Sequence, residues 1–250
     1  MAVKQFIEPE LEKDKVVIMS SLDVKGAFDA AWWPAVLKGL RDAKCPRNLY
    51  QITQDYFRER RAVISFNSST MEKKIIKGFP QGSCCGPGLW NIQYNSLRTL
   101  KYTNHKKAVA FADDLIIMMK AESIQEAENI PNVEMSKISA WAVNNKIRFN
   151  EHKSKVMLMT RRKRKERKEI KIYLNNKPLI QVHSMKYLGI IFDSKFTFRE
   201  HINCMAEKCT KLISALSKSA KLNWGLKRAT LKTIYTYLSP YTAHRSGEMT

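Results

Sequence analysis

Two apolar runs in the middle of the chain are separated by only two residues, and both of these are aspartate: AVAFADDLIIMM, residues 108–119. This spacing is typical of a β-hairpin in which each strand crosses an apolar core and the turn is tight and polar. Asp113 and Asp114 are therefore expected at the tip of the hairpin. An aspartate flanked by so many apolar side chains is costly unless solvent or a cation meets its charge. The pattern predicts a hairpin that presents two carboxylates to a functional site.

A third carboxylate follows another buried strand. Residues 16–19 (VVIM) form a short continuous apolar run, and Asp23 begins the polar turn after it. Such a run is typical of a strand that is buried on both faces. Three carboxylates on neighbouring strands repel one another at neutral pH unless a divalent metal ion joins them, and two-metal phosphoryl transfer needs this arrangement. The alternative is a pair of turn aspartates and an unrelated aspartate at a strand end.

Apolar spacing predicts the remaining helices and strands. Helices are expected over residues 29–44 with Asp29 as the N-cap, 48–57, 89–100, 123–146 with a break at Pro131, and from 199 to the end of the chain. Strands are expected over residues 61–67, 73–79, 155–160, 170–176 and 185–192. The segment GFPQGSCCGPG, residues 78–88, is rich in glycine and proline and predicts a loop that leads into a helix.

The charge of the chain favours a polyanionic partner. Among 250 residues there are 44 Lys or Arg and 23 Asp or Glu, so the formal net charge is +21. This charge is several times larger than solubility requires. No apolar run approaches the ~18 residues of a membrane span, so we expect no membrane partner. The five cysteines form no CxxC motif, which predicts a nuclear or cytoplasmic protein that is not secreted.

Five segments resemble, in the family's order, the successive motifs of a reverse transcriptase. They are LDVKGAFDAAWW, GFPQGSCCGPGLWNIQYNSL, AFADDLII, KIRFNEHKSKVM and KYLGIIFDSKFTF. The WW after FDAA, the SCCGPG block and the insertion RRKRKERK are similar to the polymerases of non-LTR retrotransposons of the arthropod R-element type. The resemblance covers roughly residues 15–235.

The resemblance implies an α+β fold, a right-hand polymerase palm whose antiparallel sheet is backed by helices. It divides the chain into a remnant of the upstream fingers region (1–14), the palm with part of the fingers (15–193) and a helical thumb-like region with an atypical C-terminus (194–250). Because family members carry a fingers region before the first catalytic aspartate, we expect the fingers to be largely missing. The chain is thus expected to be a fragmentary copy.

The resemblance also assigns roles to single residues. Asp23, Asp113 and Asp114 match the catalytic carboxylates, which with the backbone carbonyl of Val24 hold two Mg²⁺ ions, or Mn²⁺ in their place. Phe28, five residues after Asp23, matches the bulky side chain that blocks a ribose 2′-hydroxyl, so the product is expected to be DNA. Without the offset from Asp23, a core position is the more usual role of such a phenylalanine.

Further residues match contacts to the nucleotide and the primer. Gln81 corresponds to a residue that contacts the nucleotide and the template, and Gly82 lets backbone approach closely. Lys153 matches a lysine that approaches the departing pyrophosphate, with Lys155 as a close competitor. The hairpin that grips the primer end is matched by Tyr187, Leu188 and Gly189.

Two basic segments are candidates for nucleic-acid binding. The octet at residues 161–168 holds seven basic residues and one acidic residue, and its first five (Arg161, Arg162, Lys163, Arg164 and Lys165) are expected to contact the nucleic-acid backbone. A nuclear localisation signal and a solvated hairpin tip are equal alternatives. Residues 195–232 hold nine basic and two acidic residues, which suits a thumb lying against phosphates or a plain charged helix face.

The sequence therefore predicts an RNA-directed DNA polymerase that uses an RNA template, a DNA primer and deoxynucleoside triphosphates. Its oligomeric state stays open. The alternative from another class is an inactive, truncated relic or a co-opted protein that binds nucleic acid without polymerising. An RNA-directed RNA polymerase shares the palm chemistry but is disfavoured by Phe28 and by the FPQG segment.

Overall fold

The protein is described by a computed structural model that covers residues 2–100, 106–111, 114–162, 169–219, 229–230 and 232–233. Contacts divide the chain into two compact units, Met1–His183 and Ser184–Thr250, which are described separately. The predicted boundary lay ten residues later, between 193 and 194. None of the described helices is long and apolar enough to cross a bilayer.

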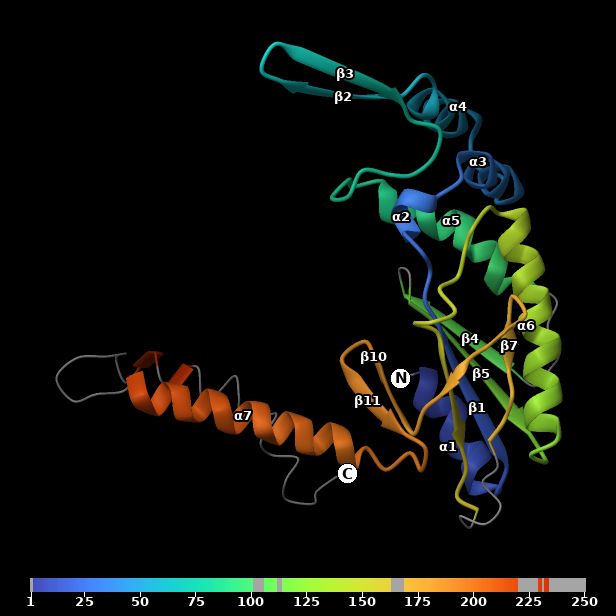
Figure 1. Cartoon of the computed structure of the whole chain (residues 1–250), viewed down its shortest axis with the longest axis vertical. Coiled ribbons are helices and arrows are strands. Elements are labelled where there is room, and N and C mark those ends of the chain that lie inside the picture. Colours follow the sequence, from blue (N-terminus) through green and yellow to red (C-terminus); the bar gives the residue numbers. More distant parts are fainter. Residues whose placement is uncertain are drawn as a thin grey trace. The chain divides into compact units, whose positions relative to one another are not determined.

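The first unit is built on a five-stranded sheet of order β4-β5-β1-β6-β9 (Figure 1). Its central strand, β1 (Val16–Leu22), pairs antiparallel with β5 (Asp114–Ala121) on one side and with β6 (Lys155–Met159) on the other. β4 (Lys106–Phe111) extends the sheet beyond β5, and β9 (Ile180–Gln181) pairs parallel with β6. The predicted α+β fold with a largely antiparallel sheet is confirmed.

The sheet is backed by helices, which explains the continuous apolar run in β1. Alternate residues Val16 and Ile18 belong to the same core cluster as Ile138 of α6 (Glu126–Asn144). Val17 and Met19, which alternate with them, face the opposite side of the strand and are also buried. The N-terminal helix α1 (Ala2–Glu12) contacts β1, β4 and β5. The buried apolar residues of α1, Val3, Ile7 and Leu11, therefore belong to a helix that packs on this sheet.

Four helices surround a two-stranded hairpin in the sequence, three before it and one after it. The helices are α2 (Ala27–Ala30), α3 (Trp33–Asp42), α4 (Arg47–Phe57) and α5 (Gly86–Arg98). The predicted single helix over 29–44 is wrong: Asp29 lies inside α2 and caps nothing. Pro34 has no N–H to donate, so it is accommodated in the first turn of a second helix, α3.

The hairpin between α4 and α5 differs from its predicted register. Its strands are β2 (Arg61–Phe66) and β3 (Ser69–Lys74), so β3 begins four residues before the predicted 73–79. Asn67 adopts a left-handed φ of 51°, which allows a tight turn. Residues 78 and 79 are not in a strand because their N–H groups donate to the carbonyls of Ala31 and Phe28.

The structure differs from three more predictions in the second half of the chain. The break expected at Pro131 is absent, because α6 runs through this residue and its buried face packs against the sheet. The strand predicted over 170–176 is a short hairpin, β7 (Tyr173–Leu174) with β8 (Lys177–Pro178). The strand predicted over 185–192 is another hairpin, β10 (Ser184–Tyr187) with β11 (Ile190–Asp193), and this hairpin is the one that the resemblance implied at residues 187–189.

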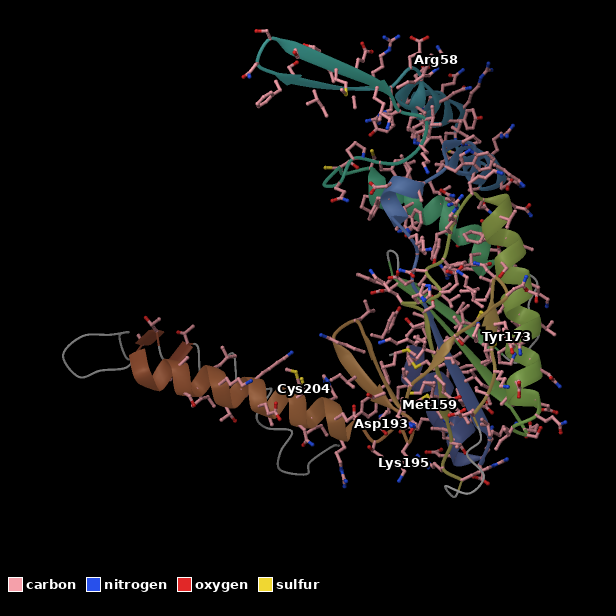
Figure 2. All side chains as sticks on the ribbon, viewed as in Figure 1. Arg58, Met159, Tyr173, Asp193, Lys195 and Cys204 are labelled. Carbon is pink, nitrogen blue, oxygen red and sulfur yellow. The ribbon has the colours of Figure 1, made fainter. Side chains whose placement is uncertain are left out.

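Up to residue 219, the second unit contains this β10–β11 hairpin and helix α7 (Arg199–Ser219). Leu188 and Gly189 have φ angles of 46° and 85°, which reverse the chain between the two strands. After β11 the carboxylate of Asp193 accepts hydrogen bonds from the main-chain N–H groups of Lys195, Thr197 and Phe198. These bonds fix the turn that leads into α7. Asp193 and Lys195, labelled in Figure 2, lie where the hairpin leads into α7.

Gln93 joins three helical segments of the first unit, and its replacement should destabilise the fold. This buried side chain accepts a hydrogen bond from Trp32 N–H at 3.1 Å and donates to the Asn145 carbonyl at 3.0 Å. Gln93→Leu leaves both main-chain groups without this partner, so we expect a loss of about 2–4 kcal/mol in the free energy of unfolding. Urea denaturation measures it, with the exposed Asn91→Leu on the same helix as the matched control. Equal stabilities for the two variants would contradict the role of Gln93.

Candidate functional site

Strand pairing places two of the three predicted carboxylates at the same end of neighbouring strands in the sheet. Leu22 pairs with Leu115, so Asp23, which follows β1, and Asp114, which begins β5, lie at the same end of adjacent strands. β4 and β5 pair up to Phe111 and Asp114 as a hairpin. The prediction that the strand before Asp23 lies beside the Asp-Asp hairpin is therefore confirmed.

The complete triad cannot be assembled from the described residues because Asp113 lies outside them. Within the part of the chain that the structure describes, no three His, Cys, Asp or Glu side chains gather as a metal-binding group. Asp23 is half-buried and Asp114 is exposed. The geometry therefore describes two carboxylates at a common edge, and the role of Asp113 stays a prediction.

A pocket of about 430 Å³ opens beside Asp23. Five predicted site residues line it, although they come from three distant segments: Asp23, Val24, Phe28, Gln81 and Lys153. The other lining residues, to which the sequence assigned no part in the site, are Lys25, Gly26, Ala27, Asp29 and Asn150. Most of these follow Asp23 directly, and only Asn150 comes from a distant segment. The pocket is thus walled by carboxylates, cations and one aromatic ring.

Main-chain hydrogen bonds hold the Gln81 loop beside Phe28. The Phe79 N–H donates to the Phe28 carbonyl at 2.9 Å, and the Gly78 N–H donates to the Ala31 carbonyl at 2.8 Å. Gly78 has a φ of 88°, and a Cβ there would meet the main chain of Asp29 at 3.0 Å. Only glycine fits this close approach, which brings the loop to the pocket.

Phe28 combines the two roles that the sequence left open. Its ring lies 6.0 Å from the ring of Trp90, centroid to centroid, in the helical layer. The side chain is half-buried and also lines the pocket. Phe28 is therefore anchored by core packing on one side and contributes an apolar wall on the other.

A turn after α6 brings Lys153 to the same pocket. The Asn150 N–H donates to the Asp23 carbonyl at 2.7 Å, and the Asp23 N–H donates to the Ser154 hydroxyl at 3.1 Å. Lys155, the competing lysine, begins β6, where it pairs with Ser21 and does not line the pocket. Position thus favours Lys153 over Lys155 for contact with a ligand in the pocket.

Glu151 adds a negative charge beside this turn. The Asn175 side-chain amide donates to its carboxylate at 3.0 Å, and the Lys25 ammonium lies 3.9 Å away. This hydrogen bond from Asn175, a second one that the carboxylate accepts from the main-chain N–H of Glu151 itself, and the charges of Lys177 and Lys25 hold the pKa of Glu151 below its usual value. Glu151 therefore stays ionised at neutral pH and balances one of the lysines around the pocket.

Among the described residues, Gly82 is a predicted site residue that does not line the pocket. Gly82 has a φ of 84°, and nothing lies within 4 Å of a Cβ built there, so backbone conformation rather than crowding requires glycine. Tyr187, Leu188 and Gly189 form the turn region of the β10–β11 hairpin in the second unit, where Tyr187 is buried and Leu188 exposed. Their role in holding a primer stays a prediction.

The predicted basic contacts are only partly described. Arg161 is exposed, whereas the Arg162 guanidinium donates to the main-chain carbonyls of Asp14 and Glu122. The rest of that basic group, Lys163, Arg164 and Lys165, lies outside the described residues. In the second unit Lys195 and, on α7, Arg199, Lys208 and Lys211 are exposed, as are Glu200 and Glu207 of the same helix. Arg162 thus has an observed structural contact, and the described part of α7 exposes charges of both signs.

The sequence is similar to known proteins. Residues 4–192 match the family model described as reverse transcriptase (RNA-dependent DNA polymerase). The chain is 30% identical, over 88% of its length, to a putative 115 kDa protein in the type-1 retrotransposable element R1DM of Drosophila melanogaster. It is 27% identical, over 89% of its length, to the RNA-directed DNA polymerase from the mobile element jockey of Drosophila funebris. These matches span only 21% and 24% of the two relatives.

The fold is also similar to solved structures. A structure of apo telomerase from Candida tropicalis, truncated from its C-terminal domain, superposes on 79% of the chain with a TM-score of 0.54 and 12% identity, and the match covers 38% of that protein. At this identity the similarity concerns the fold alone. A fold of this kind therefore occurs in a distant protein.

Proposed function

The chain belongs to the reverse transcriptase family, and on that premise we propose that it catalyses RNA-directed DNA synthesis at the pocket beside Asp23. The curated relatives are RNA-directed DNA polymerases and related proteins of arthropod non-LTR retrotransposons. Because the chain spans about a fifth to a quarter of their length, the proposal concerns the reaction of this domain. The substrates are an RNA template, a DNA primer and deoxynucleoside triphosphates.

One observation carries the proposal. Three segments that are far apart in the sequence, around Asp23, Gln81 and Lys153, converge on one pocket at the end of β1. A carboxylate, an amide and a cation there supply three kinds of group for binding a nucleoside triphosphate. The pocket also adjoins the sheet edge where Asp114 begins β5.

The residues present fit a pair of divalent metal ions. Asp23 and Asp114 offer carboxylate oxygens at one edge of the sheet, and Val24, whose carbonyl is the further candidate ligand, lines the pocket. Oxygen ligands of this kind suit Mg²⁺ or Mn²⁺. We propose that Asp23, Asp113, Asp114 and Val24 hold the ions. When bound, the ions supply charge neutralisation for the triphosphate and lower the pKa of the attacking primer hydroxyl.

The other side chains of the pocket position and select the nucleotide. Lys153 presents a positive charge where negative charge develops on the departing pyrophosphate. The Phe28 ring, held by Trp90, fills the space beside the sugar and excludes a ribose 2′-hydroxyl. Gln81 contacts the nucleotide and the template from its loop. The net charge of +21 supplies affinity for the phosphates of the template and primer.

Asp23→Asn should abolish nucleotide incorporation while it preserves nucleic-acid binding. The substitution removes a negative ligand from the pocket, but the basic surfaces that attract phosphates are unchanged. Primer extension on a primed poly(rA) template and hybrid binding by fluorescence anisotropy measure the two effects. Asp42→Asn, the same change at an exposed position at the end of α3, is the matched control. Parental incorporation by Asp23→Asn would contradict the assignment, and no incorporation by the parental chain would favour a relic or a binding protein.

Phe28→Ala should let the pocket accept ribonucleotides. Removing the ring opens room beside the sugar, so we expect the preference for dNTP over rNTP to fall about 10-fold or more, which corresponds to about 1.4 kcal/mol. The ratio of kcat/KM for the two nucleotides measures this and does not depend on the fraction of folded protein. Phe66→Ala on the exposed β2–β3 hairpin is the control and should keep the parental ratio. An unchanged ratio in Phe28→Ala would assign this ring to core packing alone.

Lys153→Ala and Lys155→Ala separate the two candidate lysines. Only Lys153 lines the pocket, so its removal should lower kcat about 10-fold or more, whereas Lys155→Ala should stay within about 3-fold of the parental rate. Single-turnover incorporation at saturating nucleotide measures the chemical step. The two variants lose the same charge, so hybrid binding should weaken equally. A larger loss in Lys155→Ala would reverse the assignment.

A further inference from the structure

We infer that Ser154 is a positioning residue whose hydroxyl holds the main chain of Asp23 in place and so aims the Asp23 carboxylate into the pocket. This inference rests on the proposed function for its catalytic consequence. The contact itself is independent of that function. Ser154 lies in the KIRFNEHKSKVM segment, where the resemblance assigns it no role, and its fully buried side chain does not line the pocket.

The Ser154 hydroxyl makes two hydrogen bonds at once. It accepts the Asp23 N–H at 3.1 Å and donates to the Asn150 carbonyl at 2.8 Å. Asn150 closes the circuit, because its own N–H donates to the Asp23 carbonyl at 2.7 Å. Both main-chain polar groups of Asp23 are thus bound to a single turn, residues 150–154.

These bonds begin where the sheet ladder ends. The pairing of β1 with β6 stops at Ser21 and Lys155, one residue after Ser154, while the pairing with β5 stops at Leu22. Asp23 therefore lies just beyond both ladders. The next main-chain bonds come from a bridge between Val24 and Phe149, in which the Asn150 N–H donates to the Asp23 carbonyl and the Lys25 N–H donates to the Arg148 carbonyl at 2.8 Å. The Ser154 hydroxyl binds the Asp23 N–H, which neither the ladders nor this bridge uses.

The restraint matters because the direction of a carboxylate depends on the main chain that carries it. A group that orients a metal-binding or catalytic side chain typically contributes 10–100-fold to metal affinity or activity. The same turn also carries Lys153, whose N–H donates to the Asn150 carbonyl at 3.2 Å. Ser154 therefore couples the carboxylate on one wall of the pocket to the lysine on another.

The chemistry of the contact requires a hydroxyl at position 154. The side chain must both accept and donate a hydrogen bond through an atom bonded directly to Cβ. Serine and threonine carry such a hydroxyl, and alanine does not. A cysteine has similar size but accepts and donates weakly. Ser154→Ala would leave the Asp23 N–H without its acceptor, while Ser154→Thr keeps a hydroxyl.

Ser20 provides a matched control for the loss of a buried hydroxyl. It lies on β1, three residues before Asp23, and is fully buried. Within the described residues its hydroxyl has no hydrogen-bond partner. Ser20→Ala therefore removes the same atom from the same strand without touching the Asp23 contact.

The first measurement is hydrogen exchange of the Asp23 amide by NMR, which needs no polymerase activity. We expect exchange of this amide to accelerate about 10-fold or more in Ser154→Ala, to stay near the parental rate in Ser154→Thr, and to be unchanged in Ser20→Ala. Unchanged exchange in Ser154→Ala would overturn the contact. If Ser154→Ala does not fold, Ser154→Cys must show the acceleration, and parental exchange in that variant overturns the inference.

The second measurement is primer extension over a range of Mg²⁺ concentrations. Ser154→Ala should lower kcat about 10–100-fold and raise the Mg²⁺ concentration for half-maximal rate, with the KM for primed template unchanged and most activity restored in Ser154→Thr. Parental kcat and Mg²⁺ dependence in Ser154→Ala, alongside an inactive Asp23→Asn, would reject the positioning role and leave the proposed function standing. An inactive parental chain would reject the proposed function, and the amide exchange would still decide the contact.

Discussion

The pairing of β1 with strands on both of its sides is the interaction on which the rest of the molecule depends. Its register with β5 sets Asp23 and Asp114 at one edge of the sheet, and its register with β6 brings the turn at 150–154 alongside. A one-residue slip of β1 would send its buried side chains to the opposite face and separate these groups. The apolar run in β1, buried on both faces, therefore fixes the site as well as the core.

A second layer of contacts brings the Gln81 loop to that edge. The Gly78–Phe79 segment donates to the main chain of α2 and the residue that follows it, and Phe28 packs on Trp90. Gln93 ties the start of α3 to the end of α6. Main-chain hydrogen bonds and ring packing thus set the shape of the pocket. The charged side chains that line the pocket do not take part in these contacts. A frame of hydrogen bonds and packed rings can hold like charges together until a ligand neutralises them.

The strand before Asp23 and the Asp-Asp hairpin could be predicted from the sequence because continuous apolar runs and their spacing report burial directly. Contacts between distant segments could not. Pro131 reads locally as a helix breaker, yet packing of α6 on the sheet outweighs that preference. Aspartate is a residue type that often caps the N-terminus of a helix, but Asp29 lies inside α2. Ser154 and Asn150 carry no distinctive pattern, since their part in the site depends on a turn meeting Asp23 across the sheet.

The central claim is that the nucleotide reacts in the pocket beside Asp23. The most direct measurement is a crystal structure of the chain with a primed RNA template, a non-hydrolysable deoxynucleoside triphosphate and Mn²⁺, in which anomalous scattering locates the ions. We predict Mn²⁺ peaks within coordination distance of the Asp23 and Asp114 carboxylates, about 2.1–2.3 Å, with the triphosphate between them and Lys153. A triphosphate bound away from this pocket, or ions that Asp23 does not contact, would contradict the account.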